Sequence, residues 1–509
     1  MASLLIRNAR VLTLDEADRE WPRADIAIEG GLIQELGPGS GEAGRYDRVI
    51  DAEGMLAMPG LVNAHFHSSG NLMKGCLPGL PLELFMLYEV PPLAAEGDAE
   101  RLAYVRTLVG ALEMLRRGVT AVHDDAYHVP VAQVSVIDAI MRAYDEVGIR
   151  AAVAIDQPTV VEYDKYPWLG ELLPEAERRA MAAAPRQSPQ ELLELYAHLI
   201  ERWHGRDNGR LGAAVSCSAP QRVTPDYLES LAALARRHDI PFNIHLLETR
   251  LQRVLGDLKY GKSLVRYVSD LGVLDEHVLA IHAIWIDERD AELLAKSGCT
   301  VAHNPVCNLR LGSGVMPLQL LRNAGVPNCL GSDEMNVDDT VNMWFVAKTA
   351  ALLQTLTTPE YREWPDGPEM LAALTRGGAR ALRRAGRLGQ LAPGCAADLV
   401  VLDLDTAAFT PLNDLRRQLV FCEDGGSVRY TIVAGRVVYE SGRVTTVDEK
   451  ALRAEARALM SSYGAQLARS DAGARRLEPY YRDMYFRAAA RDVGLRRQLH
   501  PSSTSKGKS

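Results

Sequence analysis

The stretch Pro59-Gly60-Leu61-Val62-Asn63-Ala64-His65-Phe66-His67 decides how this chain folds. It is apolar up to its two histidines and begins with Pro-Gly, which is typical of a buried strand that follows a turn. Side chains on a strand alternate between its two faces, so His65 and His67 point the same way and Phe66 points the opposite way. Two imidazoles on one side of a strand end supply half of a metal site.

The middle of the chain alternates short apolar runs with amphipathic helical segments. Eight runs are predicted strands: Leu61–His65, Val119–Asp124, Arg150–Ile155, Leu211–Cys217, Phe242–Leu246, Val278–Ile284, Thr300–His303 and Cys329–Asp333. Helical periodicity falls between them, for example at Pro225–His238 and Glu288–Ser297. Eight strand-then-helix units predict an α/β fold with a (β/α)8 TIM-like barrel, and six units in an open sheet are the competing count.

The two ends of the chain contain short, alternating β-type segments that cannot close a core separately. We expect them to meet in one small β-sandwich domain, built from residues 1–57 and 388–445, with the barrel at 58–387. Residues 446–509 are predicted to form a helical extension with a disordered tail. Thr446 and Glu449 form a capping-box pattern, which predicts where that helix begins.

Two long insertions, at 68–98 and 156–187, follow predicted barrel strands. Both insertions begin at the carboxyl ends of predicted strands, and barrel enzymes place their catalytic groups at those ends. Long loops at such ends often bind ligands, so both insertions are predicted walls of a substrate pocket.

Composition and charge restrict the class of partner. The net charge is −9 and the basic residues form no run apart from a short tail, which argues against nucleic acid or an anionic membrane as a partner. No segment approaches the roughly 20 apolar residues of a membrane span, and no signal peptide is recognisable. Seven scattered cysteines without a Cys-x-x-Cys pair indicate a reduced protein. We therefore expect a cytoplasmic protein that acts on a small molecule.

The predicted carboxyl ends of four barrel strands carry side chains that bind metals or transfer protons. These are His65 and His67 on strand one, His245 and Glu248 on strand five, His282 on strand six, and Asp333 on strand eight. Imidazoles with a carboxylate form a ligand set suited to Zn²⁺ or Fe²⁺. A lone histidine is usually an ordinary surface or core residue. Four strand ends that each offer a ligand type make coincidence improbable.

The motifs around these residues resemble those of the amidohydrolase superfamily, in the branch that holds atrazine chlorohydrolase, guanine deaminase and S-adenosylhomocysteine deaminase. The barrel motifs are PGLVNAHFHS (59–68), IHLLET (244–249), IHAIW (281–285), VAHNPVCN (301–308) and LGSDE (330–334). Residues 386–405 and 431–444 resemble the β-domain of that family. The resemblance covers residues 1 to about 445 and implies one metal ion bound by His65, His67, His245 and Asp333.

The resemblance also implies catalytic roles. Glu248 would accept a proton from a water that the metal makes acidic and deliver it to the substrate. Asp333 would orient that water, and His282 would polarise the group under attack or act as a fifth ligand. Binuclear relatives bridge two metals with a modified lysine on strand four, whereas Ala214–Pro220 contains no lysine. One divalent ion is therefore expected, with Zn²⁺ favoured and Fe²⁺ as the alternative.

The substrate is less well defined. Nucleoside-type relatives carry a histidine in a Gly-Pro-His-Ala-Pro pattern after strand four, but this chain has Ser218-Ala-Pro-Gln-Arg222, which argues against a purine nucleoside. Predicted substrate contacts, each with an alternative reading as a core or turn residue, are Tyr88, His128, Gln221, Trp285, His303 and Asn304. The resemblance further suggests a homo-oligomer.

Three functions are compatible with these observations. The first is hydrolytic deamination of a nitrogen heterocycle by a metal-activated water. The second keeps the metal but hydrolyses an amide, urea, carbamate or carbon–halogen bond. The third is a non-catalytic barrel that serves as a scaffold, which the complete ligand set disfavours.

Overall fold

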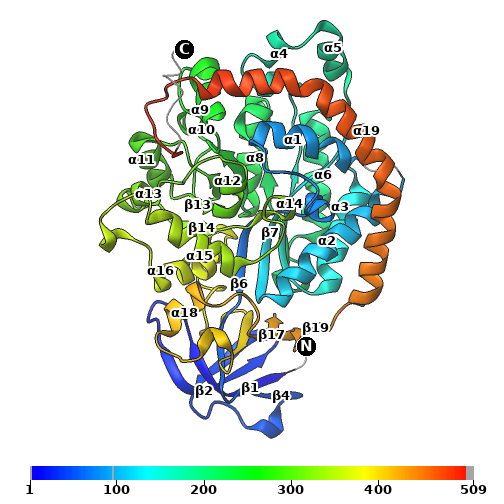
Figure 1. Ribbon diagram of the computed structural model, residues 1–509. Helices are drawn as coiled ribbons and strands as arrows, with labels where there is room; N and C mark the ends of the chain where they lie inside the picture. The colour runs from blue at the N-terminus through cyan, green and yellow to red at the C-terminus, as the bar shows by residue number, and fades with distance from the viewer. Residues whose placement is uncertain (1–2, 95–96, 500–509) are drawn as a thin grey trace.

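The computed structural model describes residues 3–94 and 97–499 of the chain (Figure 1). Its barrel strands are β6 (Leu61–His67), β7 (Val119–Tyr127), β8 (Arg150–Asp156), β9 (Leu211–Ala213), β10 (Val215–Ser216), β11 (Phe242–Leu246), β12 (Val278–His282), β13 (Thr300–His303), β14 (Asn328–Leu330) and β15 (Asp333–Glu334). The eight predicted strand positions are all occupied, and two of them, at 211–216 and 328–334, are split into short pairs.

The barrel strands form two parallel sheets of five strands. The orders are β10-β11-β12-β13-β14 and β15-β6-β7-β8-β9. Each split strand links the two sheets, because β9 pairs with β8 while β10 pairs with β11, and β14 pairs with β13 while β15 pairs with β6. The split between β14 and β15 brings Asp333 beside Phe66, and so beside the two histidines of β6.

The main helices follow the barrel strands along the chain. They are α2 (Ala99–Arg116), α3 (Val134–Val147), α6 (Pro189–Trp203), α8 (Pro225–His238), α9 (Arg250–Tyr260), α10 (Leu264–Asp270), α11 (Glu288–Ser297), α12 (Pro305–Arg310), α13 (Leu318–Ala324) and α15 (Met343–Gln354). Local sequence sets several ends: α11 starts at a capping box between Asp287 and Asp290 and stops at Gly298, which has a left-handed φ of 73°. The predicted bounds of α8 and α11 are confirmed.

The ends of the chain form a separate sheet of nine strands below the barrel in Figure 1. It contains β1 (Leu4–Leu12), β2 (Glu20–Glu29), β3 (Leu32–Gly37), β4 (Arg48–Asp51), β5 (Met55–Pro59), β16 (Leu399–Asp403), β17 (Val428–Val433), β18 (Arg436–Glu440) and β19 (Arg443–Val444). The two ends are joined where β5 pairs with β16. The sheet has its own apolar core, which confirms that both ends build one β-domain.

Gly60 separates the sheet domain from the barrel. Its N–H donates to Asp398 O (3.1 Å) in the sheet domain, and the next residue, Leu61, donates to Gly118 O (2.9 Å) at the start of a barrel strand. A Cβ on Gly60 would lie 2.2 Å from the side chain of Thr120. Only glycine allows this close approach, so the Pro-Gly pair fixes how β6 enters the barrel.

The C-terminal extension is one long helix, α19 (Glu449–Ala489). Figure 1 shows it rising along one side of the barrel and then crossing the end away from the sheet domain, above α1 (Leu82–Glu89). The predicted Thr446–Glu449 capping box is wrong. Asp448 is the N-cap, because Thr446 Oγ1 donates instead to Val147 O (2.8 Å). The predicted disordered tail falls mainly on residues 500–509, outside the described residues.

Other helices differ from the predictions in detail. The periodic segment at 369–384, which the sequence alone suggests is one helix, is divided into α16 (Gly367–Ala372), a π-helical turn (Ala373–Gly377) and α17 (Gly378–Ala381). The insertions contain helices of their own: α1 in the first, and α4 (Leu169–Leu172) and α5 (Glu175–Ala183) in the second. Among the described residues, no helix combines the length and the apolar character that crossing a bilayer requires.

Candidate metal centre and active-site cavity

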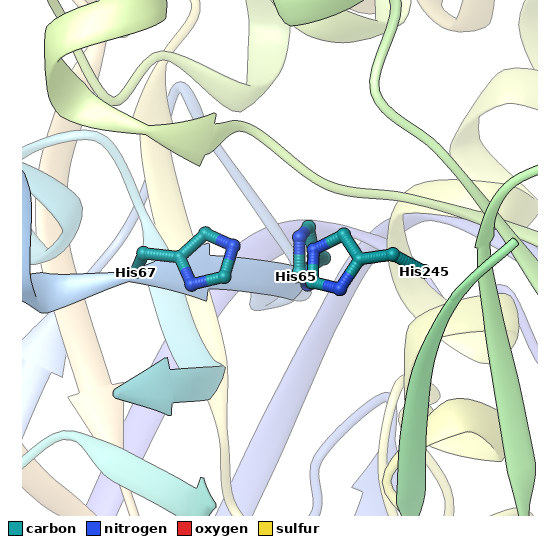
Figure 2. A group of neighbouring side chains, drawn as sticks. All are labelled: His65, His67 and His245. Carbon is teal, nitrogen blue, oxygen red and sulfur yellow. The ribbon is translucent and has the colours of Figure 1, made fainter. Parts of the chain in front are cut away.

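Three histidines from two barrel strands converge on one point. His65 and His67 leave the same face of β6 and meet His245 from β11, as Figure 2 shows. The ring centroid of His65 lies 4.7 Å from that of His67 and 4.9 Å from that of His245. Nitrogen atoms of the three rings lie within 4.8 Å of one another, a spacing that one metal ion can bridge.

Asp333 faces the same point from the start of β15. Its Oδ1 lies 3.7 Å from His65 Nε2 and 3.6 Å from His67 Nε2, and its Oδ2 lies 3.6 Å from His282 Nε2. His65, His282 and Asp333 form a second ligand group that overlaps the first. The structure therefore brings together all the predicted metal ligands, together with His282.

Hydrogen bonds fix how the imidazoles face this point. His67 Nδ1 donates to Asp125 O (2.6 Å), and His245 Nδ1 donates to Ser218 O (2.6 Å). A carbonyl oxygen only accepts, so Nδ1 carries the proton in both rings and Nε2 presents a lone pair. This support of the ring by its other nitrogen is typical of metal-binding histidines. His282 Nδ1 is held similarly by Asn308 Oδ1 (2.9 Å).

His65 gives the clearest indication that a metal belongs here. The residue is fully buried, and neither of its ring nitrogens has a hydrogen-bond partner. Burial, followed by the neighbouring histidines, holds the pKa of His65 well below its usual range, and the same causes lower the pKa of His245. Neutral imidazoles with unshared lone pairs are costly in a dry interior unless they bind something. A divalent metal fits this donor set.

Glu248 lies beside the ligand group at the end of β11. Its Oε2 is 3.5 Å from His282 Nε2, and its Oε1 accepts from Ser313 Oγ (3.3 Å). Burial raises the pKa of Glu248, so this carboxyl holds a proton more readily than an exposed glutamate does. A buried carboxyl with a raised pKa next to a metal site suits proton transfer.

Strained backbone marks the strand ends that carry the site. Ser218, Leu247, His282, Ala283 and Asp333 all have φ between 45° and 71°, a left-handed conformation that side chains other than glycine rarely adopt. Such strain clusters at functional sites, where the surrounding structure imposes it. The geometry of the metal centre is therefore accompanied by backbone strain at four strand ends.

Asp125 supports the centre in a way that the sequence did not reveal. Its backbone carbonyl holds His67, and its buried carboxyl accepts from Ser216 Oγ (3.1 Å) and from the side-chain amide of Asn243. Its Oδ2 also lies 4.0 Å from His245 Nδ1. The sequence does show an Asp124-Asp125 pair at the end of the second predicted barrel strand, but it does not show this buried network.

The centre opens into a cavity of about 390 Å³. His67, His245, Glu248, His282 and Asp333 line it on the metal side. The other walls come from α1, from the second insertion and from α19, and include Leu82, Phe85, Met86, Val160, Tyr166, Met181, Leu477 and Tyr481. Both insertions therefore line the cavity, and the C-terminal helix adds a wall that the sequence did not reveal.

Of the predicted substrate contacts, His128 lines this cavity. Its Nδ1 has no hydrogen-bond partner, and burial lowers the pKa of His128 to about 3. Gln221 is buried behind the cavity wall, whereas its neighbour Arg222 lines the cavity and donates to Ser218 Oγ (2.9 Å).

The remaining predicted contacts lie outside the cavity lining. Trp285 is fully buried in the main core, and its Nε1 donates to Ser313 O (2.9 Å). Asn304 Nδ2 lies 3.4 Å from Asp333 Oδ2, next to the metal ligands. His303 is buried with an unpartnered Nε2, and Tyr88 donates to Glu478 of α19. A substrate role for these residues stays a prediction.

Comparisons with known proteins agree with this geometry. The sequence model of the Amidohydrolase family matches residues 56–438. A 5-methylthioadenosine/S-adenosylhomocysteine deaminase from Desulforudis audaxviator is 32% identical over 89% of this chain and 97% of its own length. Two solved structures share the fold. An adenosine deaminase from Xanthomonas campestris with bound zinc is 26% identical, with a TM-score of 0.79 over 90% of this chain and 98% of that chain. An atrazine chlorohydrolase from Arthrobacter aurescens with zinc is 26% identical, with a TM-score of 0.81 over 90% of this chain and 99% of that chain.

Proposed function

This chain belongs to the amidohydrolase family, and from that premise we propose that it deaminates a nitrogen heterocycle by hydrolysis at a single divalent metal ion. It is a metal-dependent hydrolase of carbon–nitrogen bonds that acts on small molecules. The observation that carries the proposal is the fully buried His65. Its ring nitrogens have no hydrogen-bond partner, it lies within metal-bridging distance of His67 and His245, and its Nε2 is 3.7 Å from the Asp333 carboxylate.

The proposed ligands are His65, His67, His245 and Asp333. Three nitrogens and one oxygen suit Zn²⁺, and zinc is present in two solved structures that share the fold, whereas Fe²⁺ accepts similar ligands. When bound, the ion would supply a Lewis acid that makes water nucleophilic near neutral pH. Strand four, at 211–216, contains no lysine to bridge a second ion.

Glu248 is the proposed proton carrier. It would take a proton from the attacking water and deliver it to the ring nitrogen beside the attacked carbon. The second proton of that water, on the newly formed hydroxyl group, would pass to the amino group, so that the carbonyl forms as the carbon–nitrogen bond breaks and ammonia leaves. Asp333, whose carboxylate faces three imidazoles, would orient the water. His282 Nε2 lies between Glu248 and Asp333, where it either completes the ligand set or contacts the leaving group.

The test is ammonia release from a panel of aminopurines, aminopyrimidines and amino-s-triazines, with each product identified by mass. We expect release from at least one class, loss of release after chelation, and recovery when Zn²⁺ is returned. Absence of ammonia from every compound, with the metal bound, would reject deamination.

A second bond type has its own support. Ser218 and Ala219 line the cavity where nucleoside-type relatives carry a histidine, and a solved structure with the same fold is a chlorohydrolase. Release of chloride, alkylamine or a carboxylic acid in the product-mass measurement would favour hydrolysis of a carbon–halogen or amide-type bond. The same metal centre would serve either reaction.

The wider setting stays a prediction. We propose a homo-oligomer that works in a reducing compartment on a free small molecule. All seven cysteines lie in the described part of the chain as free thiols, which supports the reducing compartment. Gel filtration with light scattering would test the oligomer.

A further inference from the structure

The C-terminal helix α19 presents a regular apolar face to the active-site cavity. Ala474, Leu477, Tyr481, Met484 and Ala488 follow one another at steps of three and four residues, which places them on one side of the helix. Four of them belong to a satellite core outside the main barrel core, and the partly buried Leu477 packs against it. Within this face, Leu477 and Tyr481 reach the cavity itself.

This satellite core joins α19 to both insertions. Besides α19 it contains residues of α1 (Leu84, Leu87), of the second insertion (Tyr166, Leu169, Leu173) and of α9 (Leu251, Val254). The ring centroids of Tyr481 and Tyr166 lie 5.8 Å apart in an edge-to-face arrangement. The three segments therefore form one packed cap over the cavity, in which moving α19 would move the other two.

Polar contacts hold α19 in register on this cap. Tyr88 of α1 donates to Glu478, and Tyr481 OH donates to Glu162 Oε1 (3.5 Å) in the second insertion. At the last residue of the helix, Arg250 Nη1 donates to Ala489 O (2.9 Å). Beyond the helix, Arg497 donates to Ile284 O (2.8 Å), close to the metal-side strand β12. Each contact fixes the helix against an element that also shapes the cavity.

The cap helix lies beyond the part of the chain that defines the family. The family match ends at residue 438, eleven residues before α19 begins. The deaminase relative is covered over 97% of its own length while about a tenth of this chain stays unmatched. The family match therefore does not extend to the wall that α19 builds.

We propose that Tyr481 and Leu477 are specificity-determining residues that limit the length of the substituent on the heterocycle. The inference rests on the proposed function and adds the substrate class: a flat heterocycle with a short, uncharged substituent. Phe85, Met86 and Tyr166 supply apolar side chains on the facing walls, where Arg222 contacts Met86. Two further charged residues of the lining, Glu162 and Lys165, pair with each other (2.5 Å). The apolar side chains of Leu477 and Tyr481 on the α19 side would reject longer groups by steric exclusion.

The test compares kcat/KM for one heterocycle that carries hydrogen, methyl, ethyl, propyl or butyl at the same position. In Tyr481→Ala we expect the ratio of the longest to the shortest substrate to rise by about tenfold or more, since a methylene in an apolar pocket changes rates by about 10- to 200-fold. Leu477→Ala should shift the ratio the same way. Tyr481→Phe should leave it unchanged, because it keeps the volume and loses only the bond to Glu162.

The matched control is Phe486→Ala on the same helix. Phe486 is 54% exposed and lies outside both the satellite core and the cavity lining. Circular dichroism and metal content confirm that each variant is folded and loaded. An unchanged length profile in folded Tyr481→Ala and Leu477→Ala would overturn the inference, and so would a wild-type preference for an anionic substituent, which would point to Arg222 instead.

Binding separates this inference from the reaction itself. Calorimetric titration of the same series into Glu248→Gln measures how the binding affinity depends on substituent length, without any turnover. Absence of ammonia from the wild type would reject the deamination, while longer substituents that gain affinity in Tyr481→Ala/Glu248→Gln would still support the wall. Equal affinities across the series in both Glu248→Gln and Tyr481→Ala/Glu248→Gln would reject the role of Tyr481 in limiting substituent length and would leave the proposed reaction untouched.

Discussion

The two sides of the active-site cavity are held by different forces. On the metal side, polar side chains sit on barrel strand ends, fixed by hydrogen bonds that the histidines donate to Asp125, Ser218 and Asn308 and by strained backbone. On the cap side, α1, the second insertion and α19 are held mainly by apolar packing. We therefore expect the metal side to determine the reaction and the cap side to determine which substrate is accepted. Changes on the first side should abolish the rate, and changes on the second should alter which substrate is used.

The largest effect should come from removing a metal ligand. His65→Ala is expected to lower activity by more than about 10⁴-fold, because the ion that activates water is lost with its ligand. Metal analysis of the purified variant checks the cause. The control is His198→Ala, since His198 lies on α6 and pairs with Asp138 (2.8 Å) at the outside of the barrel. Full activity in His65→Ala would remove the basis for a metal centre.

The next effect should separate proton transfer from metal binding. Glu248→Gln is expected to lower kcat by about 10²- to 10⁴-fold while the metal content stays at the wild-type level. Burial raises the pKa of Glu248, so its basic form is lost as the pH falls through a value above the usual 4.5. The acid limb of the wild-type pH–rate profile should follow this loss and should be absent in the variant. A variant that keeps that limb would assign it to another group.

A smaller effect should appear where the two sides meet, at Glu83. Its Oε1 accepts from Thr249 Oγ1 (2.7 Å), its Oε2 has no partner, and burial, with Glu248 nearby, raises its pKa to about 7. Between pH 4.5 and 7 the unfolded chain ionises Glu83 while the folded chain does not, so stability falls as the pH rises, by up to about 3 kcal/mol. In Glu83→Gln the loss of Tm between pH 5 and pH 8 should shrink. An equal loss in both proteins would contradict this.

The smallest effect should come from a surface contact of the cap. Arg476 of α19 pairs with Glu177 of α5 (3.1 Å), but the arginine side chain is 66% exposed. An exposed pair contributes at most about 1 kcal/mol, so Arg476→Ala should lower the free energy of unfolding by less than that and leave the substrate profile unchanged. Urea unfolding measures it. A larger loss would mean that charge, and not apolar packing, holds the cap.

The convergence of the proposed ligands could be predicted from sequence because each of them follows an apolar run in a short local motif. His65, His67, His245 and Asp333 are all placed by strand period and strand end, and the barrel then determines which ends meet. Asp125 escaped prediction because its partners, Ser216 and Asn243, are distant in sequence. Only the folded ring of strands brings them together.

The cap side could be predicted only in part. The two insertions were expected to line the pocket, and they do. The periodic apolar residues from Ala474 to Ala488 indicate a helix face, but a helical period does not say what that face covers. Leu477 and Tyr481 reach the cavity because α19 crosses the barrel end, and that path depends on contacts such as Tyr88 with Glu478, 390 residues apart.

The most direct test of the central claim is a metal titration of the stripped protein, read by ammonia release from the best substrate of the panel. The geometry predicts that release rises in proportion to added Zn²⁺ and stops rising at one equivalent, because His65, His67, His245 and Asp333 surround a single point. Release that is unaffected by metal, or that needs two equivalents, would contradict a mononuclear hydrolytic centre.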